Sequence, residues 1–290
     1  MSPGLAEAHN RLRSASADLR LAAVFAAGRQ RVTLLAVLAI YVELREILVE
    51  CADAGVARVK LGWWQEELEL LARHAPRHPL CKLLDEHCGG HVLPTQTWYE
   101  ITASVATDIS AVAFDNFDEV ERYCRQRGGA LSELAAQIAG PQPPDTLQAA
   151  RLLGQSWQLA DIVLHAKEYA RHGRNYFAVD DLRKYALSES LTGNALASAA
   201  GARLLEDYRR RALAMRVSAT ALAGIQWPSL KCGLVIAGLA AARLKKRAAR
   251  QKFAHDATPE LGAVQQLLVA WRSARRARPI TEPGLSHGTR

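Results

Sequence analysis

The chain has 290 residues, of which 49% are hydrophobic and 23% charged, so it can bury a core of globular size. The formal net charge is +8, and the five cysteines are scattered without paired spacing, which favours reduced thiols over a disulfide framework. No basic-then-apolar leader follows Met1, and no run reaches the roughly 20 apolar residues of a membrane span. These features argue against secreted and membrane-spanning classes. We therefore expect a cytoplasmic protein that can associate with a membrane surface.

Strand signals are almost absent, and glycine and proline gather at a few joints, so the sequence predicts an all-α protein. Helices are expected, in chain order, over residues 6–27, 32–52, 58–73, 79–87, 95–113, 115–139, 146–172, 180–185, 196–213, 228–250 and 259–278. The proline-rich joint at 140–144 is the clearest break. Neither side of it offers a complete core, so we predict one large helical bundle over 1–278 and a disordered tail over 279–290.

The predicted helix 146–172 carries a polar ladder formed by Asp161, His165, Glu168 and His172. Steps of four, three and four residues place these side chains on one helix face. Gly173 is a typical helix end, and Arg174 and Tyr176 follow it. The ladder could supply ligands to a transition metal, but a metal site in a bundle needs ligands from several helices. A polar face with an Asp161–His165 hydrogen bond is the simpler interpretation.

One group of residues resembles the second signature of the squalene/phytoene synthase family, which reads Gln-Leu-x-Asn-Ile-Leu-Arg-Asp-x-x-x-Asp followed by Gly-Arg-x-Tyr-Leu-Pro. The matching residues are Gln158-Leu159, Ile162, Gly173-Arg174 and Tyr176. The segment 58–68 resembles the family's Arg-Leu-x-Trp-Trp-Arg-x-x-Leu helix. Asp108 with Tyr123-Cys124 resembles its Asp-Leu…Tyr-Cys-x-x-x-Ala-Gly segment. The resemblance covers about 35–185 and implies the isoprenoid synthase bundle, with a cavity for a prenyl diphosphate or another lipid.

The chain departs from the family at the residues that bind magnesium. In the second signature, the two aspartate positions hold His165 and Tyr169. In the first signature, a gapless alignment from Tyr41 places the aspartate positions within 48–52, and this stretch contains no aspartate. Imidazole and phenol are poor ligands for magnesium, which prefers oxygen donors in octahedral geometry. A family branch without these aspartates acts in respiratory complex I assembly, and segments 42–44 and 60–64 resemble it. The resemblance thus favours a non-catalytic role that binds a lipid or a protein partner.

Two alternatives stay open. The first is an active prenyltransferase of squalene/phytoene synthase type, which condenses prenyl diphosphates head to head and needs Mg²⁺. Displaced acids would hold the metal, and the candidates are Glu46, Glu50 and Asp53 together with Asp161 and Glu168. Arg58, Arg174 and Tyr176 are the candidates for holding the diphosphate. The second alternative is a transition-metal bundle built on the ladder, with His165 as a ligand. No cofactor is expected otherwise.

A zinc site built from a second group of metal-ligand residue types is disfavoured. It consists of His78, Cys81, His87, Cys88 and His91, and its cysteines lack the two-to-four-residue spacing of structural zinc. Trp63, Trp64, Trp98 and Trp157 are expected in the core.

Basic residues concentrate late in the chain, over 243–252 and 272–278. No aromatic residues interleave with these basic runs, so nucleic-acid binding is disfavoured. A solvated helix face is the simplest interpretation. An anionic membrane surface is the next candidate partner, because the first basic run follows the apolar residues 234–239.

Overall fold

A computed structural model describes residues 2–14, 17–26, 28–51, 53–88, 93–111, 113–138, 140–222, 224–249 and 260–275. Every regular element within these ranges is helical, so the all-α prediction is confirmed. The predicted tail 279–290 lies outside the described residues, and the single domain over 1–278 stays a prediction.

The helices are α1 (Pro3–Ser14), α2 (Ala17–Val24), α3 (Gly28–Glu50), α4 (Ala54–Ala72), α5 (Pro79–His87), α6 (Thr95–Ser110), α7 (Phe117–Cys124), the π-helical segment η1 (Arg125–Gly129), α8 (Ala130–Gln137), α9 (Pro144–Arg171), α10 (Val179–Lys184), α11 (Gly193–Ala197), α12 (Ala199–Ala221), the 3₁₀ turn η2 (Trp227–Leu230), α13 (Lys231–Ala249) and α14 (Ala263–Arg275).

Local signals set several of these bounds. α5 begins and ends where predicted, since His78 caps its first turn by accepting a hydrogen bond from Leu80 N and Pro79 opens the helix. The backbone of Gly173 has φ +67°, which glycine adopts at little cost, and it follows directly on the end of α9. α10 begins at Val179, one residue before the expected start at 180. Ala178 is the N-cap there and provides no side-chain hydrogen bond.

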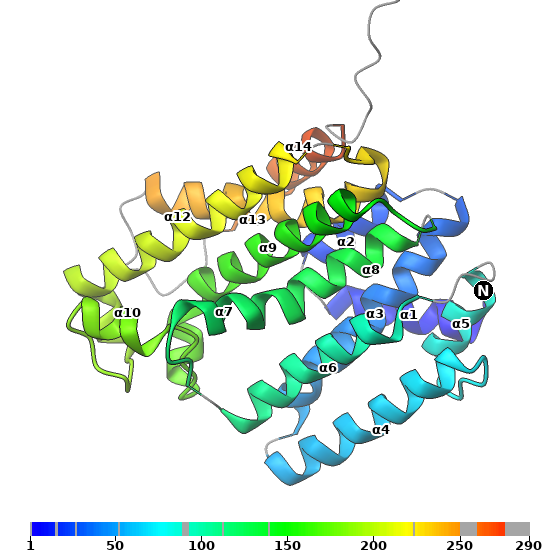
Figure 1. The fold of residues 1–290 in the computed structure, drawn as a ribbon, viewed down its shortest axis with the longest axis horizontal. Coiled ribbons are helices and arrows are strands. Elements are labelled where there is room, and N and C mark those ends of the chain that lie inside the picture. Colours follow the sequence, from blue (N-terminus) through cyan, green and yellow to red (C-terminus); the bar gives the residue numbers. More distant parts are fainter. Residues whose placement is uncertain are drawn as a thin grey trace, which may run out of the picture.

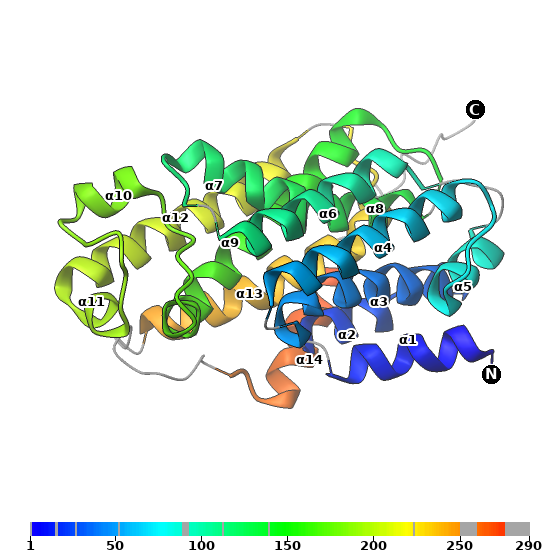
Figure 2. The ribbon, with the colours of Figure 1, turned by 90° about the horizontal axis from the view of Figure 1, so that it is seen from below.

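The prediction of one helix over 6–27 is also wrong, because this stretch forms both α1 and α2. α1 packs mainly against α3 and α5, whereas α2 packs mainly against α13 and also touches α3. Figure 2 shows α1, α2 and α14 on one side of the molecule and α6, α7 and α10 on the other.

α9 runs through the middle of the bundle, between α12 on one side and α8 on the other (Figure 1). It contacts η1 closely, because a Cβ atom on Gly154 of α9 would collide with the carbonyl oxygen of Gly128 in η1. This contact fixes η1 against the middle of α9. The residues around η1 therefore face the polar ladder of α9.

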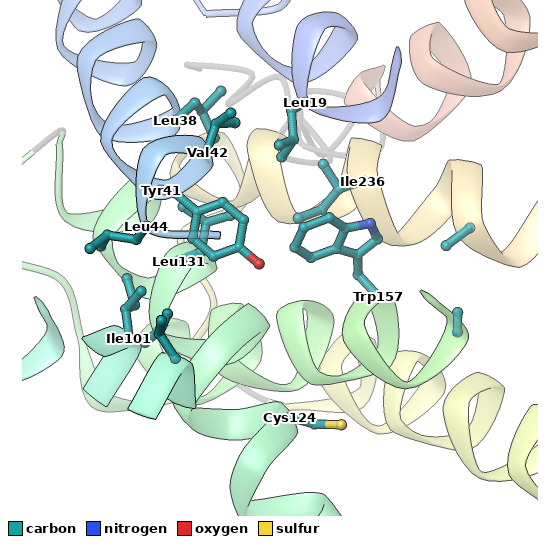
Figure 3. Close-up of a cluster of buried hydrophobic side chains, with 14 of the residues drawn as sticks. Leu19, Leu38, Tyr41, Val42, Leu44, Ile101, Cys124, Leu131, Trp157 and Ile236 are labelled. Carbon is teal, nitrogen blue, oxygen red and sulfur yellow. The ribbon is translucent and has the colours of Figure 1, made fainter. Parts of the chain in front are cut away.

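The bundle centre is filled by side chains from several helices (Figure 3). Tyr41 of α3 and Trp157 of α9 meet there with ring centroids 6.0 Å apart, and Leu131 lies beside them. Trp64, Trp98 and Trp157 are buried as expected, but the prediction is wrong for Trp63, which is 40% exposed. No helix among the described residues is both long and apolar enough to cross a bilayer.

Candidate functional site

The polar ladder of α9 borders a cavity of about 540 Å³, which we call the α3–α9 cavity. It is lined by Arg45, Leu48, Val49, Asp108, Arg127, His165, Glu168, Tyr169, His172, Arg174 and Tyr176. The lining is amphipathic, with Leu48 and Val49 as its aliphatic wall. The other lining residues are charged, polar or aromatic.

Asp108 of α6 is neutralised within the bundle. It forms a buried ion pair with Arg127 of η1, and the hydroxyls of Tyr123 and Tyr176 donate hydrogen bonds of 2.9 and 2.8 Å to its Oδ1 atom. Burial and the nearby Asp108 charge raise the pKa of Tyr176 to about 12, so this phenol stays a donor at neutral pH. The Asp108 carboxylate is thus engaged at both oxygens.

Asp161 of α9 is engaged in a similar way. His165 Nδ1 lies 3.1 Å from its Oδ1 atom, and the Tyr169 hydroxyl donates a 2.6 Å hydrogen bond to Oδ2. Burial alone would raise the pKa of Asp161, but His165, Arg45 and Tyr169 together lower it below the usual range. Burial by itself would lower the pKa of the His165 imidazole, but the neighbouring Asp161 carboxylate raises it. The predicted Asp161–His165 contact is present, and its charges stabilise each other.

The two engaged carboxylates belong to one network. The rings of Tyr169 and Tyr176 meet edge-on with centroids 4.8 Å apart, which joins the partners of Asp161 to those of Asp108. Arg45 of α3 lies close enough for the Asp161 charge to raise the pKa of its guanidinium, against the effect of burial. Arg45 therefore stays cationic at the cavity wall.

A second cavity of about 490 Å³, the α2–α14 cavity, lies on the other side of this network. Arg45 and His165 line both cavities, so they form part of the shared wall. Asp18 of α2 lines the second cavity and is buried in a short ion pair with Arg243 of α13. Burial raises the pKa of Asp18, and its Oδ1 atom has no hydrogen-bond partner among the described residues.

The displaced acids proposed within 46–53 lie elsewhere. Glu46 and Glu50 each approach Arg11 of α1 at 3.4 Å, and Glu50 also pairs with Lys60 of α4. Asp53 caps α4 by accepting a 2.9 Å hydrogen bond from Val56 N. None of these three acids lines the α3–α9 or the α2–α14 cavity, so the structure does not bring them together with Asp161.

Of the remaining candidate residues, some line the α3–α9 cavity and others lie away from it. Arg174, Tyr176 and Glu168 line the α3–α9 cavity, whereas Arg58 is exposed on α4 and lines neither cavity. In the disfavoured zinc group, His78 serves as the α5 cap and burial raises the pKa of the Cys88 thiol to about 11. His91 lies outside the described residues.

The residues of the α3–α9 cavity do not fit the magnesium ions that the resemblance implies. The aspartate positions on α9 hold His165 and Tyr169, and Leu48 and Val49 face the cavity from α3. The carboxylates of Asp108 and Asp161 already bind cations and phenols of the chain itself. Within the described part of the chain, no group of three or more His, Cys, Asp or Glu side chains is arranged to hold a metal ion.

Sequence reasoning missed Arg127 as a site residue. The signal was its place three residues after Tyr123-Cys124, in the segment that resembles Tyr-Cys-x-x-x-Ala-Gly. Its pairing with Asp108, 19 residues away, depends on the π-helical turn of η1 and was not visible as a pattern.

Comparison with known proteins gives the family. The squalene/phytoene synthase model matches residues 12–273. The chain belongs to the squalene/phytoene synthase family. It is 28% identical over 171 residues to the phytoene synthase of Arthrospira platensis, covering 53% of this chain and 55% of that protein. It is 28% identical over 163 residues to chloroplastic phytoene synthase 1 of Arabidopsis thaliana, covering 53% of this chain and 39% of that protein.

Solved structures show the same fold. A dehydrosqualene synthase in complex with ligand superposes with a TM-score of 0.78 at 14% identity, covering 94% of this chain and 96% of that chain. Squalene synthase HpnC from Alicyclobacillus acidocaldarius gives a TM-score of 0.64 at 15% identity, covering 94% of each chain. The predicted isoprenoid synthase fold is therefore confirmed. The sequence matches span about half the length, or less, of these curated members of the squalene/phytoene synthase family.

Proposed function

We propose that this member of the family binds an anionic prenyl compound or other phosphate-bearing lipid in the α3–α9 cavity and does not condense prenyl diphosphates. A role in which the loaded protein serves an assembly partner is compatible with this binding function. The observation that supports the proposal is that His165 and Tyr169 stand at the family's aspartate positions and bind Asp161, while Arg127 neutralises Asp108.

Ionising an allylic diphosphate creates a polyanionic leaving group, which magnesium held between carboxylates would stabilise. Here His165 and Tyr169 bind Asp161, and Arg127, Tyr123 and Tyr176 bind Asp108. A metal would have to displace these partners before it could use either carboxylate. Leaving a buried arginine without its counterion costs about 3–5 kcal/mol.

The same cavity offers donors to an anion directly. Arg45 and Arg174 are guanidinium groups at its wall, and His165 is biased toward its protonated form. Hydrogen bonds from charged donors to phosphate oxygens are short and strong. Leu48 and Val49 provide an apolar surface beside these donors for the hydrocarbon part of a ligand.

Calorimetric titration with farnesyl diphosphate, once with EDTA and once with Mg²⁺, tests this function. We expect binding in EDTA and a change of less than about threefold on adding Mg²⁺. Arg45→Met or Arg174→Met should weaken binding about tenfold or more, because each removes charge-assisted hydrogen bonds of about 1.5–3 kcal/mol. Arg58→Met is the matched control, since Arg58 lies outside both cavities, and it should bind normally. Binding that requires Mg²⁺ would contradict the proposal and favour the active prenyltransferase.

A further inference from the structure

α14 exposes its large apolar residues. Val264, Leu267, Leu268 and Trp271 are 72%, 52%, 48% and 46% exposed. Their spacing of three, one and three residues places them on one helix face. A helix that only covers a bundle would turn these side chains inward, so this outward apolar face requires an explanation.

The inner face of α14 is built from small residues. Ala270, Ser273 and Ala274 are buried, and a Cβ atom on Gly238 of α13 would collide with Ser273 Oγ. The two helices therefore approach closely, and larger side chains would not fit between them. This packing fixes the rotation of α14. α14 lies at the edge of the molecule (Figure 2), and its large apolar side chains are exposed there.

The charge of α14 identifies the surface that it fits. The helix contains Arg272 and Arg275 in its last turn and no acidic residue. The Arg275 guanidinium lies 4.5 Å from the centroid of the Trp271 ring, which keeps a cation beside the apolar face. Tryptophan and arginine next to aliphatic residues are typical of helices that lie at the boundary between lipid headgroups and acyl chains.

A second exposed apolar stripe lacks this charge pattern. It consists of Val56, Val59 and Trp63 on α4, and the basic residue within it, Lys60, pairs with Glu50. Exposed apolar side chains alone therefore do not carry the argument. At α14 a fixed apolar face lies beside Arg272 and Arg275, for which the described part of the chain shows no ion-pair partner.

We propose that α14 docks the protein onto an anionic phospholipid bilayer. Val264, Leu267, Leu268 and Trp271 enter the acyl boundary, while Arg272 and Arg275 contact lipid phosphates. Gln266 of the same helix lines the α2–α14 cavity, so docking brings that cavity next to the bilayer. The docking surface does not depend on what the α3–α9 cavity binds.

Co-sedimentation of the full chain with vesicles tests this inference. One set of vesicles contains only phosphatidylcholine, and the other contains phosphatidylcholine and phosphatidylglycerol at about 7:3. We expect at least tenfold stronger binding to the anionic vesicles, reduced by 0.5 M NaCl because exposed charges are then screened. Equal binding to both sets of vesicles, or no binding, would overturn the proposal.

Paired variants identify the surface. The double variant Leu267→Gln/Trp271→Gln should reduce binding to anionic vesicles about tenfold or more. The control Val56→Gln/Val59→Gln also replaces two exposed apolar side chains by glutamine, but in the α4 stripe, and should bind normally. Arg272→Gln/Arg275→Gln should remove the preference for anionic vesicles. Arg183→Gln/Arg210→Gln removes the same charge from residues that are two-thirds exposed and should keep the preference.

Two further measurements keep the result interpretable. Circular dichroism and thermal melting of each variant show that it is folded, which is expected because the substituted side chains are exposed. Light scattering without lipid shows whether α14 instead joins two copies of the chain. A dimer that Leu267→Gln/Trp271→Gln makes monomeric, with vesicle binding unchanged, would overturn membrane docking.

Discussion

Asp108 lines the α3–α9 cavity and Asp161 lines the α2–α14 cavity, and each carboxylate is bound by side chains of the chain itself. Arg127 reaches Asp108 from the π-helical segment η1, and His165 reaches Asp161 from one turn along α9. The His165 contact follows from i,i+4 spacing and could be predicted. The Arg127 contact spans 19 residues and three elements, so periodicity alone could not reveal it.

Removing one partner of the buried pair should be strongly destabilising. Arg127→Met leaves the Asp108 charge buried with only two phenol donors, and we expect a loss of about 3–5 kcal/mol in the free energy of unfolding. Urea denaturation measures it. Arg183→Gln removes an exposed ion-paired arginine and should cost at most about 1 kcal/mol. Equal effects of the two substitutions would show that the Arg127–Asp108 pair is not buried as described.

The Asp161–His165 pair should make stability depend on pH. The folded pKa of His165 is raised, so its contribution is fully present below the unfolded value of about 6.5 and is lost as pH rises through the folded pKa. The folded pKa of Asp161 is lowered, so its contribution is present above about 3.9 and is lost as pH falls through the folded pKa.

His165→Gln removes the titrating ring while keeping a polar side chain. We expect it to lower the free energy of unfolding by about 1–3 kcal/mol at pH 5.5, and by less at pH 9. Urea denaturation of both proteins at the two pH values gives the difference. A difference that stays constant or grows toward pH 9 would argue against the charged pair.

At the scale of elements, sequence signals located most helices, and contacts between helices decided the remaining details. The bounds of α5 and the end of α9 agree with those predicted from the sequence, because the residues that cap α5 and the glycine that follows α9 act locally. α1 and α2 were predicted as one helix, because nothing in the sequence shows that they pack on different partners. Glu46 and Glu50 share the expected face, but Arg11, 35 and 39 residues away, pairs with them there.

The crossing of α9 and η1 depends on glycine. Gly154→Ala should destabilise the protein by about 1–3 kcal/mol, because its Cβ atom would collide with backbone atoms of Gly128 and the helices would have to separate. Gly62→Ala is the matched control, since no atom lies within 4 Å of a Cβ atom built there on α4. It should be neutral or stabilise by up to about 1 kcal/mol through helix propensity. Thermal melting of both variants distinguishes these outcomes.

On the scale of the whole molecule, helical periodicity and the family resemblance were enough to predict the all-α isoprenoid synthase bundle. They also placed Arg174, Tyr176, His165 and Tyr169 at one site, and all four line the α3–α9 cavity. They could not show that Arg127 neutralises Asp108, because that pair forms between two different helical segments. They likewise could not show which face of α14 is turned outward, because that depends on the fit of Ser273 against Gly238.

Diphosphate release is the measurement that tests the proposed function most directly. The pure, folded protein is incubated with farnesyl or geranylgeranyl diphosphate and Mg²⁺, and both released diphosphate and extractable hydrocarbon products are assayed. The neutralised carboxylates predict no release above the protein-free control, even while the ligand binds in EDTA. Release that EDTA abolishes, together with a condensed product, would contradict this account and identify the protein as an active prenyltransferase.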